Sequence, residues 1–274
     1  GRKELFLNKI KIEDKIKNAT SNGVRVIVLA SSDNINATIF NDLVFVGAIF
    51  IKDPVRKEAK EGIRLISNAS IKTVMITGDN KNTAEAIARE VGLVNDSSDI
   101  IITSDELNSL SDSEVKRMLP KLKVVSRSLP QDKSRLVRLS KEMGLVTGMT
   151  GDGVNDAPAL KRADVGFAFG SGSEVAKEAS DIVILDNNFL SIAKAVLFGR
   201  TIFKSIRKFI IFQLTVNLCA LSISIIGPFI GVETPVTVIQ MLWINMVMDT
   251  LAALAFAFEP PLLEYMNEKP KKKD

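Results

Sequence analysis

The chain has 274 residues, of which 46% are hydrophobic and 25% charged, and its formal net charge of +4 at pH 7 gives no reason to expect binding to nucleic acid. It contains no histidine and one cysteine, Cys219, so nucleophile pairs that use histidine, His-ligated zinc and a disulfide framework are excluded. Any chemistry must therefore use Asp, Glu, Lys, Thr, Asn and backbone groups.

The first 51 residues predict a helix followed by two strands. The strands are expected at residues 24–30 (VRVIVLA) and 43–51 (LVFVGAIFI), which are short β-branched runs separated by the polar stretch SSDNINAT. Gly1 stands where an initiator Met is expected, and this predicts that the sequence is an excerpt from a longer protein.

Strand and helix patterns alternate from Lys52 to about Leu197. We expect helices over KEAKEGIRLISNA, NTAEAIAREVGL and DKSRLVRLSKEMG, and strands over TVMIT, KVVSRS, LVTGMT, VGFAF and DIVIL. Nearly continuous apolar strands that alternate with helices predict a parallel sheet covered on both faces, an α/β Rossmann-like fold. Ligands bind such sheets at the carboxyl ends of the strands.

The last third of the sequence contains two apolar runs. Residues 209–230 carry no charge, and residues 235–258 carry one, Asp249. Each is long enough at about 1.5 Å per residue to cross a hydrocarbon core of about 30 Å, although a buried hairpin of a soluble domain is an alternative. Basic residues flank both runs, which predicts cytoplasmic ends and an external GVET turn. The basic tail is an anchor or a contact for calmodulin or lipid.

Two clusters follow predicted strands and fit phosphate chemistry. Thr77, Gly78 and Asp79 come directly after TVMI and offer a hydroxyl, a close backbone approach and a carboxylate, although a plain β-turn is equally consistent. Lys133 opens a helix after KVVSRS, where it can neutralise a phosphoryl group or simply be solvated. Arg127 lies six residues upstream and is expected to reach the same ligand.

The segment MTGDGVNDAP, residues 149–158, gives the most specific signal. Asp152 and Asp156 stand on one tight loop, and paired carboxylates together with phosphate oxygens and water suit Mg²⁺. The Asn155 amide can bind a phosphate oxygen. Asp53 and Arg56, in KDPVR, are candidates for a nucleotide contact near a hinge, and a helix start with proline at its first position is the alternative.

The order KDPxR, TGD, PxxK, GDGxNDAP, basic stretch and apolar hairpin resembles the second half of P-type ATPases, whose phosphorylation domain is of the haloacid-dehalogenase type. The resemblance implies that Asp152 binds Mg²⁺ and that Asp156 supports Lys133 and the metal loop. It also implies contacts to nucleotide or phosphoryl oxygens from Thr77, Gly78, Asp79, Arg127, Lys133 and Asn155.

One departure from the family pattern is large. These pumps phosphorylate an aspartate in the sequence DKTG, and no DKTG occurs here. The resemblance therefore implies that the chain is an inactive part of a pump and needs the missing N-terminal part as its partner. Residues 1–51 are expected to end the nucleotide-binding domain. Residues 52–198 would form a phosphorylation domain without its first strand, and residues 199–274 a transmembrane hairpin.

The hairpin carries candidate ligands for the transported ion. Asn245 and Asp249 are four residues apart and share a helix face, and Asn217 is the amide at similar depth in the first span. Their oxygen atoms suit Ca²⁺, although hydrogen bonds between the helices are an alternative. MLWINMVMDT and FQLTVN resemble plasma-membrane-type calcium pumps. Ala220 and Met248 replace ligands of two-site pumps, which predicts one calcium site without excluding Mn²⁺.

These interpretations together predict ATP-driven calcium export, with ATP as substrate and Mg²⁺ as cofactor. The protein is expected to be a multi-pass membrane protein of the plasma membrane or of a vacuolar or other endomembrane, with its catalytic part in the cytoplasm. A membrane-anchored phosphatase of the same superfamily and a non-catalytic fragment are the alternatives. A dinucleotide-binding enzyme is disfavoured, because FGSGSEVAKE has no third glycine at the required spacing.

Overall fold

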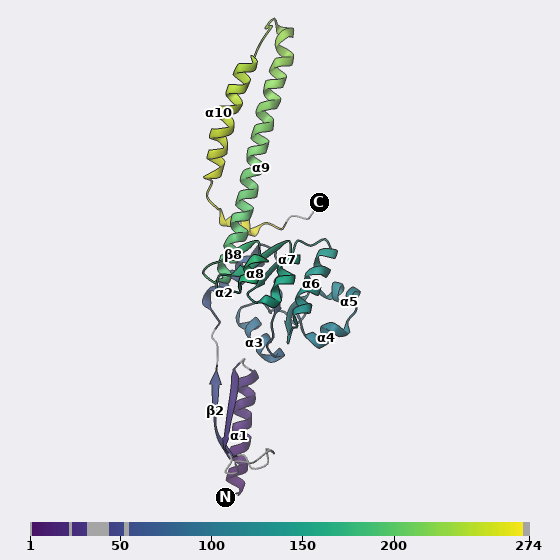
Figure 1. Ribbon diagram of the computed structural model, residues 1–274, viewed down its shortest axis with the longest axis vertical. Helices are drawn as coiled ribbons and strands as arrows, with labels where there is room; N and C mark the ends of the chain where they lie inside the picture. The colour runs from purple at the N-terminus through teal and green to yellow at the C-terminus, as the bar shows by residue number, and fades with distance from the viewer. Residues whose placement is uncertain (1, 22–23, 32–43, 52–54, 271–274) are drawn as a thin grey trace. The chain divides into compact units, whose positions relative to one another are not determined.

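The computed structural model describes residues 2–21, 24–31, 44–51 and 55–270 (Figure 1). It divides into two compact units, one of residues 1–192 with 269–274 and one of residues 193–268. The predicted fold class is confirmed: an α/β part with parallel strands precedes a hairpin of two long apolar helices.

The N-terminal elements match the predicted order of one helix and two strands. They are α1 (Arg2–Ser21), β1 (Arg25–Ser31) and β2 (Val44–Ile51), and the two strands pair in antiparallel register. Consecutive apolar residues such as Ile27 and Val28 are both exposed. Because neighbouring residues of a strand point to opposite faces, both faces of this ribbon present apolar surface.

The α/β part runs from α2 to β8, and every pair of neighbouring strands in it is parallel. Most of its elements were predicted from the sequence, but β4 and the short helices α4, α5, α7 and α8 were not. The elements are α2 (Lys57–Asn68), β3 (Met75–Ile76), α3 (Lys81–Glu90), β4 (Ile100–Thr103), α4 (Ser104–Ser109), α5 (Asp112–Met118), β5 (Leu122–Ser126), α6 (Pro130–Glu142), β6 (Gly148–Gly151), η2 (Val154–Asp156), α7 (Ala157–Arg162), β7 (Val165–Phe169), α8 (Glu174–Glu178) and β8 (Ile182–Ile184).

The strands of the α/β part form two sheets. Their orders are β3-β5-β4 and β6-β7-β8, so that β3 and β6 are both edge strands among the described residues. No described strand hydrogen-bonds to both β3 and β6, so the predicted parallel sheet is interrupted between these two edge strands, as expected of a domain without its first strand.

Helix α6 joins the two sheets through the hydrophobic core. Its Leu136 and Leu139 pack in a cluster with Leu122 and Val125 of β5. Val137, on another face of the same helix, packs in a second cluster with Met149 of β6. Because α6 packs on both sheets, a residue at its N-terminus is placed relative to the ends of strands in both of them.

Asp164, in the turn between α7 and β7, bonds to Thr147 and Lys141. These bonds to its carboxylate predict a pH-dependent contribution to the stability of the fold. Its Oδ2 accepts hydrogen bonds from Thr147 N (2.9 Å) and Thr147 Oγ1 (3.1 Å), and Lys141 Nζ lies 3.2 Å from Oδ1. The Thr147 amide first, and then Lys141 and the Thr147 hydroxyl, lower the pKa of Asp164 to about 2. The lowered pKa means that the folded state favours the ionised carboxylate.

We therefore expect Asp164→Asn to lower the free energy of unfolding by about 1–2 kcal/mol at pH 7. A carboxylate with a lowered folded pKa stabilises the fold above its unfolded pKa, and this contribution is lost as the pH falls from about 4 to about 2. Urea denaturation of both proteins in detergent micelles, followed by circular dichroism, measures the difference. A difference that stays unchanged from pH 7 down to pH 3 would contradict this origin.

The second unit is a helical hairpin. Helix α9 (Phe189–Ile226) continues into η3 (Gly227–Ile230), and α10 (Val238–Ala257) is followed by η4 (Leu263–Asn267). Both long helices are apolar and long enough to cross a membrane. The first predicted span began at 209, but its helix begins at Phe189, because a helix can continue through a charged segment that lies outside the apolar run.

The two helices of the hairpin contact each other at an aromatic pair. The rings of Phe212 on α9 and Phe256 on α10 pack edge to face, with 6.2 Å between their centroids. The chain after α10 returns to α9, where Lys208 bonds to Glu259 and Lys204 bonds to Glu268. Arg200 donates to the carbonyl oxygen atoms of Tyr265 (2.6 Å) and Glu268 (2.9 Å).

Candidate functional site

The turn after β3 is ordered by its own side chains and by the loop after β5. Thr77 Oγ1 donates to Asp79 Oδ2 (3.0 Å), and the Asp79 amide donates back to Thr77 Oγ1 (3.2 Å). The amides of Arg127 and Ser128 donate to the carbonyl oxygen atoms of Asp79 and Thr77. Arg127 adopts φ of 50°, which turns the chain back towards residues 77–79.

Lys133 is positioned by a buried carboxylate that precedes it by one residue. Asp132 is fully buried and accepts hydrogen bonds from Ser104 Oγ (2.6 Å), Asn108 Nδ2 (3.0 Å) and Leu129 N (2.8 Å). Three donors satisfy the charge of this carboxylate, so the first turn of α6 is fixed. Asp132 was not among the predicted site residues, and its only signal in the sequence is an acidic residue two positions after Pro130.

Lys133 bonds to the loop after β6. Its Nζ lies 2.6 Å from Asp156 Oδ1, and both side chains are largely buried. The second oxygen, Oδ2, accepts from the amides of Asp152 (3.2 Å) and Gly153 (3.3 Å). Both carboxylate oxygen atoms of Asp156 therefore have protein partners, and the bond to Lys133 connects α6 to this loop.

Gly151 and Asp156 are in close contact within the same loop. A Cβ atom added at Gly151 would lie 2.5 Å from Asp156 Cβ, closer than such atoms can approach. No role was predicted for Gly151, although a glycine directly before Asp152 was visible in the sequence. The structure gives the reason for this glycine: the Asp156 side chain occupies the space that a side chain at position 151 would need.

Asp152 and Asn155 differ from Asp156 in having free side chains. Both are exposed, and in the part of the chain that the structure describes neither side chain has a hydrogen-bond or ion-pair partner. Mg²⁺ takes few protein carboxylates and completes its shell with phosphate oxygens and water. The free Asp152 carboxylate fits one such ligand position, whereas the carboxylate of Asp156 is used within the loop.

The predicted site residues thus form two groups. Thr77, Gly78, Asp79 and Arg127 lie on adjoining loops after β3 and β5, and Lys133, Asp152, Asn155 and Asp156 lie on α6 and the loop after β6. Within the described ranges, no hydrogen bond between side chains joins the two groups.

The predicted nucleotide contacts at residues 53 and 56 are only partly visible. Asp53 lies outside the described residues. Arg56 Nη1 donates to the carbonyl oxygen of Asn187 (2.8 Å), which follows β8. Arg56, Asp152 and Asn187 line one cavity of about 300 Å³ together with Ala59, Phe169, Ser171, Asn188 and Phe189.

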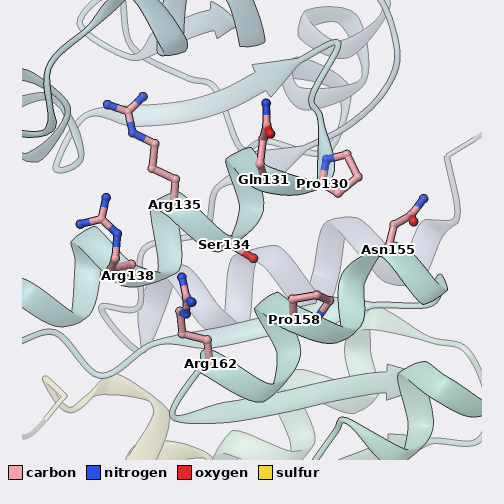
Figure 2. A pocket seen from close by; sticks show the side chains of 8 residues that line it. All are labelled: Pro130, Gln131, Ser134, Arg135, Arg138, Asn155, Pro158 and Arg162. Carbon is pink, nitrogen blue, oxygen red and sulfur yellow. The ribbon is translucent and has the colours of Figure 1, made fainter.

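A second pocket, of about 410 Å³, lies between α6 and the segment from η2 to α7 (Figure 2). Asn155 lies at one end of the view, and Arg135 and Arg138 lie at the other. Both arginines bond to Asp112, and their hydrogen bonds, first from Arg138 and then from Arg135, lower the pKa of that carboxyl. Arg138 also pairs with Glu142, so both guanidinium groups already have carboxylate partners in the protein rather than being left for a ligand.

The predicted ion ligands differ in solvent exposure within the hairpin. Asn245 and Asp249 are half-buried on α10, whereas Asn217 on α9 is exposed. Oδ1 of Asp249 and Oε1 of Gln213 are shielded from solvent and have no hydrogen-bond partner within the described residues. Gln213 was not among the predicted ligands, and its signal in the sequence is a polar side chain in an otherwise apolar run.

Family models match most of the chain. Residues 4–164 and 138–196 match two models described as haloacid dehalogenase-like hydrolase. Residues 233–274 match the model described as the C-terminus of cation transporting ATPases.

Curated relatives are similar over most of the chain. A calcium-transporting ATPase of Dictyostelium discoideum, PAT1, is 42% identical over 96% of this chain and 26% of its own length. Plasma membrane calcium-transporting ATPase 3 of Homo sapiens is 43% identical over 88% of this chain and 20% of its own length. The chain thus spans about a fifth to a quarter of the relatives it matches.

A solved structure shares the fold. The crystal structure of a zinc-transporting PIB-type ATPase in the E2.Pi state has a TM-score of 0.59 and 24% sequence identity, over 93% of this chain and 33% of its own. The family models and the curated relatives agree with this fold over both the α/β part and the hairpin. The chain therefore belongs to the haloacid dehalogenase-like hydrolase family and is homologous to calcium-transporting P-type ATPases.

Proposed function

We propose that this chain is part of an ATP-driven calcium pump, in which it supplies most of the phosphorylation domain and one membrane hairpin. The observation that carries the proposal is the pairing of two features in one chain. A free, exposed Asp152 stands at the end of a parallel strand, and a partnerless carboxylate oxygen, Asp249 Oδ1, lies inside an apolar hairpin. The first suits magnesium and phosphate, and an ionisable residue inside a span is the usual mark of an ion pathway.

In this proposal the residues of the α/β part position and neutralise a phosphoryl group. Lys133 supplies positive charge near the transferred group, and Asp156 holds Lys133 and the loop. Asp152 binds Mg²⁺, whose charge would offset that of the phosphate oxygens. Gly78, Arg127 and Asn155 donate hydrogen bonds to phosphoryl or nucleotide oxygens. The Thr77 hydroxyl, which donates to Asp79 Oδ2 in this structure, would have to turn away from Asp79 to donate to the same ligand. Positioning and charge neutralisation are what phosphoryl transfer requires of a protein.

The separation of the strands into two sheets supports the proposal that a further strand pairs between them. One parallel strand placed between β3 and β6 would join the two sheets into the order β4-β5-β3-x-β6-β7-β8, and its carboxyl end would lie at the edge that carries Asp79 and Asp152. We propose that this strand carries the phosphorylated aspartate. It would belong to the N-terminal part of the pump, outside the 274 residues.

The remaining assignments follow from the same proposal. Residues 1–51 end the nucleotide-binding domain, residues 52–198 belong to the phosphorylation domain, and residues 199–274 form the hairpin. Asp53 and Arg56 lie near the ATP site at the hinge. Both ends of the hairpin face the cytoplasm, where a basic tail can bind a regulator such as calmodulin. The pump is multi-pass and resides in the plasma membrane or in a vacuolar or other endomembrane.

Calcium-dependent phosphorylation tests the proposal. The complete pump, incubated with radiolabelled ATP and Mg²⁺, should form an acid-stable phosphoenzyme only when calcium is present. The 274-residue chain alone should form none, because it contains no DKTG. Co-expression of the chain with the upstream part should restore the signal. A phosphoenzyme on the chain alone would show that the nucleophile is one of its own aspartates.

A further inference from the structure

We propose that residues 170–173, the Gly-Ser-Gly-Ser segment between β7 and α8, position Asp152 for metal binding. We call this segment the glycine loop. The inference rests on the proposed role of Asp152 as the magnesium ligand and adds the element that fixes it. Two of the four residues are glycines, yet the spacing does not fit dinucleotide binding, so their presence needs another physical reason.

The first reason is a close approach of two backbones. A Cβ atom added at Gly172 would lie 2.9 Å from the carbonyl oxygen of Asp152 and 3.1 Å from its Cα. These are backbone atoms, so a side-chain rotation cannot relieve the contact. A substitution at Gly172 must therefore displace either the glycine loop or the backbone that carries Asp152.

The second reason is a hydrogen bond made possible by that approach. The Ser173 amide donates to the Asp152 carbonyl oxygen at 2.8 Å, and the Gly172 amide donates to Phe169 O at 2.9 Å. On its other side the Asp152 amide donates to Asp156 Oδ2. The main chain of Asp152 is thus held at both its amide and its carbonyl, while its carboxylate keeps no partner among the described residues.

The glycine loop is itself held from outside. The Ser171 amide donates to Asn187 Oδ1 (3.0 Å), and the carbonyl oxygen of Asn187 accepts from Arg56 Nη1 (2.8 Å). Asn187 has φ of 50°, a left-handed conformation that asparagine tolerates and most residues do not. Arg56 and Asn187 therefore support the loop that supports Asp152.

The cavity at this place has room for a hydrated metal. Asp152, Ser171, Asn187 and Arg56 all line the cavity of about 300 Å³. That volume is well above the roughly 10–15 Å³ that one water molecule needs on the same measure. Mg²⁺ keeps several of its waters when it binds one or two carboxylates, so the free Asp152 carboxylate beside this space suits it. Groups that orient a metal ligand typically change metal affinity about 10–100-fold when they are removed.

Binding of Mn²⁺, a paramagnetic substitute for Mg²⁺, to the 274-residue chain in detergent micelles tests the inference by electron paramagnetic resonance. We expect Gly172→Ala to weaken Mn²⁺ binding at least about 10-fold. Asn187→Gly keeps the left-handed backbone and removes only the bond to Ser171, and we expect a loss of about threefold. Asp152→Asn should abolish the Mn²⁺ binding that remains when Asp249→Asn removes the proposed hairpin site, and circular dichroism checks that every variant is folded.

Gly166→Ala is the matched control. Its new Cβ would lie 3.0 Å from the Leu160 carbonyl oxygen, a similar backbone clash within the same unit but away from Asp152. It should lower the melting temperature and leave Mn²⁺ affinity unchanged. If Gly172→Ala and Asn187→Gly bind Mn²⁺ like the wild type while Asp152→Asn does not, the glycine loop has no positioning role and Asp152 keeps its own. Equal Mn²⁺ binding by Asp152→Asn and wild type would refute the magnesium assignment, and the role of the loop with it.

Discussion

Lys133→Met is expected to lower the rate of phosphorylation of the complete pump by ATP about 100–1,000-fold. A fixed positive group beside a transferring phosphoryl group stabilises charge in the transition state, and the removal of one such group costs about that factor. The variant also removes the partner of a largely buried carboxylate, since Lys133 Nζ lies 2.6 Å from Asp156 Oδ1. We therefore expect a loss of about 2–3 kcal/mol in the free energy of unfolding, somewhat below the range for a fully buried pair.

Two further variants separate the chemistry from the stability. Lys121→Met removes the charge of an exposed lysine and should leave both quantities unchanged. Lys133→Met combined with Asp156→Asn removes both charges and keeps an oxygen that can accept from the Asp152 and Gly153 amides, so most of the stability should return. Phosphorylation should remain slow. Recovery of the rate together with the stability would contradict a catalytic role for Lys133.

Asp249→Asn is expected to abolish calcium-dependent phosphorylation of the complete pump. On the membrane-insertion scale an aspartate at the centre of a span costs about 2.5–3.5 kcal/mol, whereas each Leu, Ile, Phe or Val returns about 0.3–0.6. Residues 235–258 contain ten of these, so their gain of about 3–6 kcal/mol little more than offsets the charge. A carboxylate placed at that cost, with Oδ1 shielded and without a partner in the described hairpin, fits a cation ligand.

The control for this prediction is Thr250→Ala, one residue further along α10. Thr250 is exposed in the hairpin, and its hydroxyl donates to Met246 O within its own helix. The variant should phosphorylate in response to calcium like the wild type. Full calcium response in Asp249→Asn, measured as phosphoenzyme against free calcium concentration, would remove Asp249 from the proposed site.

The elements with strong local signals could be predicted from the sequence. Helix α6 has a proline at its start and apolar residues at helical spacing, and the apolar runs of β7 and α10 are equally clear. Strand β4 was missed because its short apolar run, Ile100–Ile102, stands between polar residues that read as a loop. The order of the strands in the two sheets was not predicted, because pairing between distant strands leaves no mark in the local pattern.

In the candidate site, too, residues with a local signal could be predicted from the local pattern, whereas contacts between distant residues could not. Asp152 and Lys133 could be found from residue type and place in the chain. The resemblance also implied that Asp156 supports Lys133 and the metal loop, and its two oxygens divide these tasks: Oδ1 bonds to Lys133 on α6, and Oδ2 accepts from the amides of Asp152 and Gly153. Gly172 and Asp152 are in contact although they are twenty positions apart in the sequence. The sequence alone shows only a glycine at position 172 and gives no reason for it.

ATP-driven calcium uptake into sealed membrane vesicles tests the central claim most directly. Inside-out vesicles that contain the complete pump should accumulate radiolabelled calcium only with ATP and Mg²⁺, and an ionophore should release it. One calcium ion should be bound per phosphoenzyme, since the resemblance to two-site pumps implies that Ala220 and Met248 replace their further ligands. Vesicles with Asp249→Asn should accumulate none. A ratio near two would contradict the single site, and uptake of another cation in place of calcium would contradict the proposed function.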